Sequence, residues 1–112
     1  MACVLRPKPE APHVFQAPTG ATVTLIIKES VGSIVFLRAR YGDRDLVADG
    51  QSAASIQFNV IAGRNVLMMV FGFSETPGGR GELHEDCGDG SSTRLRNLSA
   101  ADPAQNLTIE GV

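Results

Sequence analysis

The chain has 112 residues, with 10 basic and 12 acidic residues and a formal net charge of −2 at pH 7. This length suits one domain with a core of its own, and a hydrophobic content of 43% excludes a wholly disordered chain. The excess of acids argues against nucleic-acid binding driven by bulk charge. No apolar run approaches the ~20 residues that span a bilayer. We therefore expect neither a nucleic-acid partner nor a membrane span.

The first 20 residues hold four of the six prolines. Proline fixes φ and lacks the backbone N–H group, so this composition predicts an extended, proline-rich N-terminal arm over residues 1–20. Residues 13–17 of this arm could add to a sheet as an edge strand. The remaining residues, 21–112, are expected to form a single domain.

From residue 21 onward, apolar and polar residues alternate with the period of two that is typical of half-buried strands. One such strand is expected at residues 34–41, with Arg38 and Arg40 on one face and Val35, Leu37, Ala39 and Tyr41 on the other. Further strands are expected at residues 22–28, 56–60, 81–87, 93–98 and 106–110.

Two segments allow more than one interpretation. Residues 66–73 form the most apolar run, which favours a central strand covered on both faces; a buried helix is the alternative. Residues 46–54 are ambiguous, because residues 49–50 signal a turn and residues 52–54 suit a loop or a short helical turn. The chain thus reads as short strands with a turn signal about every 8–12 residues and no helical periodicity. This pattern predicts an all-β antiparallel sandwich or small barrel.

Residues 58–71 carry a strand, a turn with Gly63 and Asn65, and a second strand. This hairpin resembles those of bacterial immunoglobulin-like and fibronectin-type domains, in which a glycine and an asparagine turn the chain between two inward-alternating strands. The resemblance implies an immunoglobulin-like antiparallel β-sandwich of seven or eight strands. Domains of that kind are mostly adhesive, spacer or binding modules, so it implies an architecture rather than an activity.

The chain has two cysteines, Cys3 and Cys87, too few for a structural zinc site. They could form one disulfide between the N-terminal arm and a late hairpin, or remain two unrelated thiols. The first residues lack the apolar segment of a signal peptide. We expect a cytoplasmic protein if Met1 is native, and a periplasmic or secreted one if methionine was added to a mature chain. A disulfide would favour the second case. Eight arginines against two lysines indicate a bacterial gene.

Acidic residues gather in the glycine-rich segment 75–92. Calcium takes six to eight oxygen ligands, which sandwich loops can supply. This segment is therefore the candidate site of a carbohydrate- or calcium-binding module, with one tyrosine as the platform on which a sugar ring could stack. A solvated hairpin tip is the plainer alternative. The candidate ligand residues are Tyr41, Glu82, Glu85, Asp86 and Asp89.

No catalytic motif is evident, since the chain has neither a nucleophile elbow nor a phosphate-binding loop. His84 and Cys87 could pair as base and nucleophile, but three residues apart on a hairpin they are more simply neighbours. We expect no enzyme, no metal site and no cofactor. The prediction is a non-catalytic protein-interaction or assembly module with a protein partner or self-association. The saccharide- or calcium-binding module is the alternative.

Overall fold

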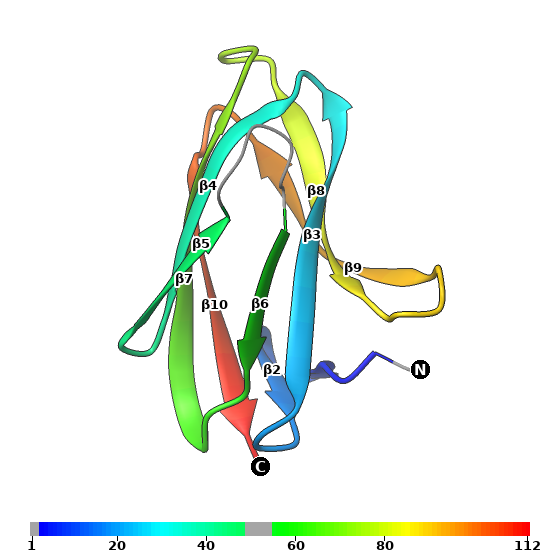
Figure 1. Ribbon diagram of the computed structural model, residues 1–112, viewed down its shortest axis with the longest axis vertical. Helices are drawn as coiled ribbons and strands as arrows, with labels where there is room; N and C mark the ends of the chain where they lie inside the picture. The colour runs from blue at the N-terminus through cyan, green and yellow to red at the C-terminus, as the bar shows by residue number, and fades with distance from the viewer. Residues whose placement is uncertain (1–2, 49–54) are drawn as a thin grey trace.

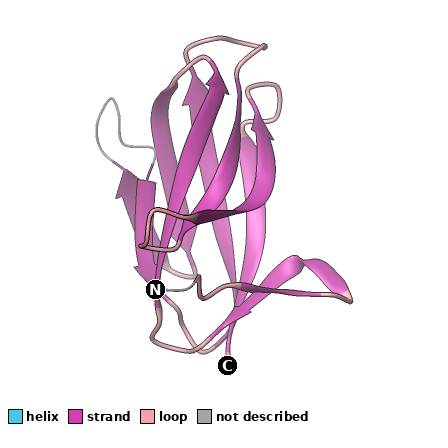
Figure 2. Cartoon of the chain, turned by 90° about the vertical axis from the view of Figure 1, so that its right-hand side faces the viewer, coloured by secondary structure: helices cyan, strands magenta, loops and turns pink. Residues whose placement is uncertain are grey.

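The computed structural model describes residues 3–48 and 55–112, and this part of the chain contains strands, turns and loops but no helix (Figure 2). The strands form two sheets that pack face to face, which confirms the predicted all-β class with two layers (Figure 1). Ten strands lie within the described residues. Their bounds are β1 (Arg6–Lys8), β2 (Ala11–Ala17), β3 (Thr22–Val31), β4 (Ile34–Tyr41), β5 (Arg44–Ala48), β6 (Ser55–Asn59), β7 (Gly63–Phe73), β8 (Arg80–Asp86), β9 (Ser92–Ser99) and β10 (Ala104–Gly111).

The larger sheet, sheet A, has the strand order β1-β2-β10-β7-β4-β5, and the smaller one, sheet B, has the order β6-β3-β8-β9. Neighbouring strands are antiparallel except for β2 and β10, which run parallel. The chain crosses between the sheets six times: from β2 to β3, from β3 to β4, from β5 to β6, from β6 to β7, from β7 to β8 and from β9 to β10. Strand β7 therefore lies in the interior of sheet A, between β4 and β10.

The core lies between the two sheets and follows the period of two along each strand. On β3, Val23, Leu25 and Ile27 are buried while the residues between them point outward. On β7, the inward residues Leu67 and Met69 are at most 1% exposed. This alternation is the pattern that the sequence carries in its half-buried strands, and it places the core where the sequence predicts it.

Residues 6–17 of the expected N-terminal arm are part of sheet A. The sequence suggests an edge strand here, but β2 lies between β1 and β10, and β1 is the edge. The prolines fit this position because Pro7 lies in the edge strand and Pro12 precedes Val14, the first residue of β2 to pair with β10. Strands β1 and β5 raise the count above the expected seven or eight.

The face assignment on β4 differs from the sequence-based expectation at one residue. Val35 is 53% exposed, whereas Ile34 is buried. The register with β7 shifts between Ile34 and Phe36, so Val35 is the extra residue of a β-bulge. The bulge turns Phe36 outward with Arg38 and leaves the inward alternation to begin at Leu37.

The apolar run at residues 66–73 lies in an interior strand, as the sequence indicates, but only one of its faces is covered. Val66, Met68 and Val70 are each 46% exposed on the outer face of sheet A. The expectation of cover on both faces is therefore wrong for this chain alone, and the alternative of a helix is excluded because the segment lies in β7. Of the ambiguous segment, residues 46–48 belong to β5, and residues 49–54, with the expected turn or loop, lie outside the described residues.

Residues 3–5 are bound to sheet B by a disulfide and by hydrogen bonds to a buried carboxylate. Cys3 and Cys87 form a disulfide with their Cα atoms 4.4 Å apart. The side chain of Glu85, which is 3% exposed, accepts hydrogen bonds from the backbone N–H groups of Val4 (2.8 Å) and Leu5 (3.1 Å). We call residues 3–5 with these contacts the N-terminal strap; it joins β8 of sheet B to β1 of sheet A.

Replacing both cysteines, Cys3→Ala with Cys87→Ala, should lower the free energy of unfolding by about 2–4 kcal/mol, because the disulfide closes a loop between residues 84 apart in the sequence. Urea unfolding of the wild type and the double variant measures this difference. Reductant should reproduce the loss in the wild type and have no effect on the variant. Equal stability of the oxidised wild type and the variant would contradict the role of the disulfide.

Candidate interaction surface

Three large apolar side chains occupy the outer face of β7. Val66, Met68 and Val70 stand two residues apart, so they point to the same side of the sheet. Each is 46% exposed, although β7 lies between two paired neighbours. We call these three residues the apolar stripe.

The stripe is extended by an aromatic ring from β4. Phe36 is 44% exposed and pairs with Gly72 at the end of the stripe. A Cβ atom at residue 72 would collide with the Phe36 ring, so this ring lies directly against the glycine backbone. Glycine at this position thus allows an aromatic side chain of β4 to continue the apolar surface of β7.

The two strands beside the stripe differ in chemistry. On β4, Arg40 is opposite Met68 and Arg38 is opposite Val70, and both arginines are exposed. On β10, the residue opposite Met68 is Asn106. The remaining partners on β10 are Thr108 beside Val66 and Ala104 beside Val70. The apolar stripe therefore has a basic border on one side and a border of small and neutral polar residues on the other.

An open hollow of about 610 Å³ adjoins one end of the stripe. Two residues of the stripe, Val66 and Met68, line it, so the hollow and the stripe form one continuous surface. The other lining residues come from the β4–β5 turn, the β6–β7 connection and the start of β7: Gly42, Asp43, Ile61, Arg64 and Asn65.

A charged cluster on Glu110 lies at the same end of this face and joins four strands. The Glu110 carboxylate accepts hydrogen bonds from Gln16 on β2 (2.6 Å) and from Arg64 on β7 (2.9 Å), and it pairs with Lys8 on β1 at 3.3 Å. These donors, Gln16 first and then Arg64, lower the pKa of Glu110 from 4.5 to about 2. The cluster therefore keeps a negative charge among basic groups over the ordinary pH range.

The outer face of sheet B is polar by contrast. His84 is 9% exposed on this face, and its ring is hydrogen-bonded through Nδ1 to the Ser92 hydroxyl (3.0 Å) and through Nε2 to Glu82 (2.9 Å). Glu82 also pairs with Arg94 at 3.6 Å. The hydrogen bond from His84, ahead of the charge of Arg94, lowers the pKa of Glu82.

This chain of side chains has the order of a nucleophile, a base and a carboxylate. The hollow beside the apolar stripe is not lined by Ser92, His84 or Glu82. The contacts instead link β8 to β9 across the outer face of sheet B. The arrangement thus explains why a buried histidine is tolerated at this position, since both of its ring nitrogens have partners.

Tyr41 does not offer a platform for a sugar ring. Its side chain is 1% exposed, its ring lies 4.6 Å from that of Phe58, and its hydroxyl accepts a hydrogen bond from the Ile61 N–H group at 2.9 Å. The sequence-based expectation of an exposed aromatic is therefore corrected. The hydroxyl instead anchors the β6–β7 connection to the end of β4.

Each acidic candidate residue accepts hydrogen bonds from a different part of the chain. Glu85 holds the N-terminal strap, and Glu82 holds His84. Asp86 and Asp89 accept hydrogen bonds from backbone N–H groups two residues ahead, the local pattern of an Asx turn. The structure does not bring the five candidate residues to one point. Within residues 3–48 and 55–112, no three or more His, Cys, Asp or Glu side chains gather as a metal site would require.

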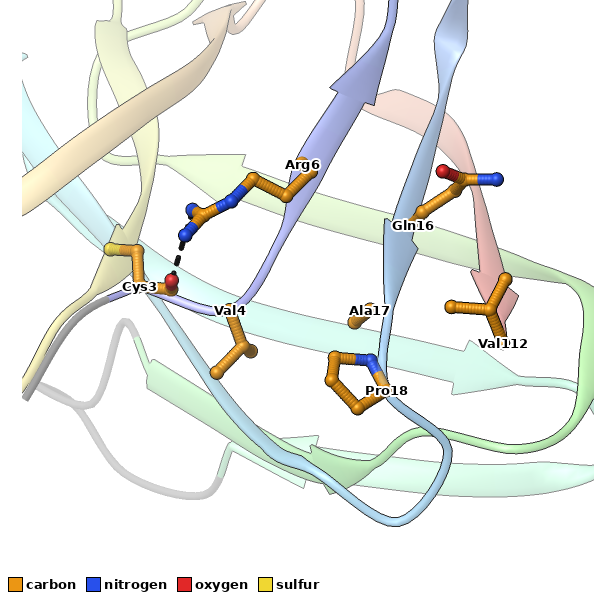
Figure 3. A pocket seen from close by; sticks show the side chains of 7 residues that line it. All are labelled: Cys3, Val4, Arg6, Gln16, Ala17, Pro18 and Val112. Atoms are coloured by element: carbon orange, nitrogen blue, oxygen red, sulfur yellow. Dashed lines mark hydrogen bonds between the residues drawn. The ribbon is translucent and has the colours of Figure 1, made fainter.

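A second hollow, of about 380 Å³, lies where the N-terminal strap meets β2 (Figure 3). Its charged side chain, Arg6, donates a hydrogen bond to the Cys3 carbonyl oxygen at 3.1 Å, so this guanidinium already has a partner within the chain. The sequence alone does not indicate this hollow, because its residues come from both ends of the chain. It is lined by Cys3, Val4, Arg6, Gln16, Ala17, Pro18 and Val112.

The chain matches no family model, no curated protein and no solved structure. The described residues include no helix long and apolar enough to cross a membrane. The geometry of the chain itself therefore carries the functional argument. Among the described residues, the outer face of sheet A gathers four large apolar side chains that are 44–46% exposed, namely Phe36, Val66, Met68 and Val70.

Replacing Glu110 with glutamine should remove a pH-dependent part of the stability. A pKa lowered by folding means that the carboxylate stabilises the fold fully above pH 4.5 and loses this effect as the pH falls toward about 2. Thermal melts should show the wild type above Glu110→Gln at pH 6, with the difference disappearing between pH 4.5 and 2. Glu10→Gln, at an exposed residue of the β1–β2 turn, is the matched control. A difference that persists unchanged at pH 2 would contradict this assignment.

Proposed function

We propose that this chain is a non-catalytic protein-interaction or assembly module that docks another protein through the outer face of sheet A. The observation that carries the proposal is the apolar stripe, three large side chains left nearly half exposed in the interior of the larger sheet. Removing apolar surface from water contributes about 25 cal/mol per Å². A contiguous exposed patch of this kind marks an interaction site more often than a scattered apolar residue does.

The surroundings of the stripe support the same function. Interfaces typically have an apolar centre, a polar rim, and an enrichment in methionine, aromatic residues and arginine. Here Met68 lies at the centre, Phe36 at one end, and Arg38 and Arg40 along one border. The flexible methionine side chain adapts to the shape of a partner. Among the residues that the structure describes, the polar outer face of sheet B shows no comparable group of exposed apolar side chains, so the two faces suggest different roles.

We further propose an immunoglobulin-like arrangement for the sandwich. In immunoglobulin domains, strands B and E lie in one sheet and strands C, F and G in the other. The order β6-β3 in sheet B and β10-β7-β4 in sheet A supports assigning β3, β4, β6, β7 and β10 to strands B, C, E, F and G. The hairpin β8–β9 is an addition between F and G that pairs with β3. This assignment places the apolar stripe on strand F.

The function predicts that binding depends on the stripe and not on exposed apolar residues elsewhere. Proteins retained by the immobilised wild type should be lost from Met68→Asp and retained by Val31→Asp, since Val31 is 42% exposed but lies on β3. Aspartate at these half-exposed strand residues should lower the stability by about 1 kcal/mol in both variants, which thermal melts will check. Equal retention by all three chains, or loss only from Val31→Asp, would overturn the proposed docking surface.

A further inference from the structure

The outer face of sheet A has about the size of one side of a stable interface. Strands about 4.8 Å apart, with a rise of about 3.3 Å per residue, give a six-stranded face of eight-residue strands an area of roughly 700 Å². A standard protein–protein interface buries about 800 Å² on each partner. That is roughly one eighth of the 6230 Å² accessible surface of the chain. A partner with an equally flat face could thus cover the stripe completely.

The face is also complementary to itself in one orientation. Two copies can lay stripe on stripe if a two-fold axis runs along β7, between the facing sheets. This rotation exchanges the two sides of β7, so β4 of one copy faces β10 of the other. Arg40 then lies opposite Asn106 of the second copy, since both are paired with Met68 in their own sheet. The Arg40 guanidinium then meets an amide oxygen as acceptor, with the Thr108 hydroxyl two residues along the strand. Arg38 lies opposite Ala104 of the second copy, whose side chain is small and uncharged.

The other two-fold axis, perpendicular to β7 within the interface, has no such match. It lays β4 on β4, so that Arg40 faces Arg40 of the second copy. Like charges brought together across an interface are costly, and the exposed Asp45 carboxylate, 3.8 Å from Arg40, offsets only part of this repulsion. The axis along β7 also brings Arg64 near Arg64 of the second copy, but each Arg64 is paired with its own Glu110 at 2.9 Å. The basic border on one side of the stripe and the neutral polar border on the other therefore select the axis along β7.

We propose that the occupant of this surface is a second copy of the chain, in a two-fold dimer whose axis runs along β7 and whose two apolar stripes pack on each other. This inference rests on the proposed function and names its partner. Sheets that pack face to face lie about 10 Å apart with their strands about 30° from parallel. The dimer would thus be a four-layered molecule with sheet A of each copy in the middle.

The mass of the particle in solution tests the partner. Sedimentation equilibrium should give twice the monomer mass of 11.8 kDa at high protein concentration, with dissociation on dilution. Met68→Asp and Val70→Asp should each raise the dissociation constant at least about tenfold, and Val31→Asp should leave it unchanged. A wild type that stays monomeric to about 1 mM, or a dimer that both stripe variants leave intact, would overturn the proposal.

Cysteine cross-linking tests the axis. A short bifunctional thiol reagent should join Arg40→Cys to Asn106→Cys when the two variants are mixed, because the facing sheets lie about 10 Å apart, and Arg40→Cys alone should not be joined to itself. Linkage of Arg40→Cys to itself would overturn the axis along β7. The wider function has its own test: a monomeric wild type whose retained proteins are lost from Met68→Asp rejects the second copy as the occupant but supports docking of a different protein. A monomeric wild type whose retained proteins are also retained by Met68→Asp would reject the surface.

Discussion

The register of β7 between β4 and β10 is the constraint on which the rest of the molecule depends. A slip by one residue would turn Leu67, Met69 and Phe71 outward and bring the apolar stripe inward, and both sets are apolar. The hydrophobic pattern of β7 therefore cannot choose its own register. Its neighbours do, because β4 and β10 alternate clearly between buried apolar and exposed polar residues. The turn at Gly63, with a φ of 83°, and the hydrogen bond of Tyr41 to the preceding connection fix where β7 begins.

The same property explains how far the sequence predicts this fold. Strands with one polar face, such as β3 and β6, could be located from their alternation, because side-chain period and burial agree. The face of β7 could not be assigned, since alternation carries no information when both faces are apolar. The bulge at Val35 and the place of β2 inside sheet A depend on pairing with strands far away in the sequence. Residues near in sequence do not encode such pairings.

The candidate site was harder to predict than the fold, for a related reason. Five acidic or aromatic residues look available for a ligand as long as their partners are unknown. The Glu85 carboxylate accepts hydrogen bonds from backbone N–H groups 80 and 81 residues away, and the Tyr41 hydroxyl accepts one from an N–H group 20 residues away. Asp86 and Asp89 are used by their own turns. The exposed surface instead consists of apolar residues, which the sequence alone would place in a core. They are exposed because the sandwich has two layers, and the outer face of sheet A lies on the outside of one of them.

The N-terminal strap also determines how the domain would carry a mechanical load. Tension applied to the chain before Cys3 passes through the disulfide to Cys87, so residues 4–86 lie inside a covalent loop and bear none of it. The force continues along β9 and reaches β10, which is held on both sides by β2 and β7. Only the segment after residue 87 can be extended by the force, because the disulfide closes residues 4–86 into a loop. A covalent shortcut at one end thus makes this sandwich a short, stiff link under tension.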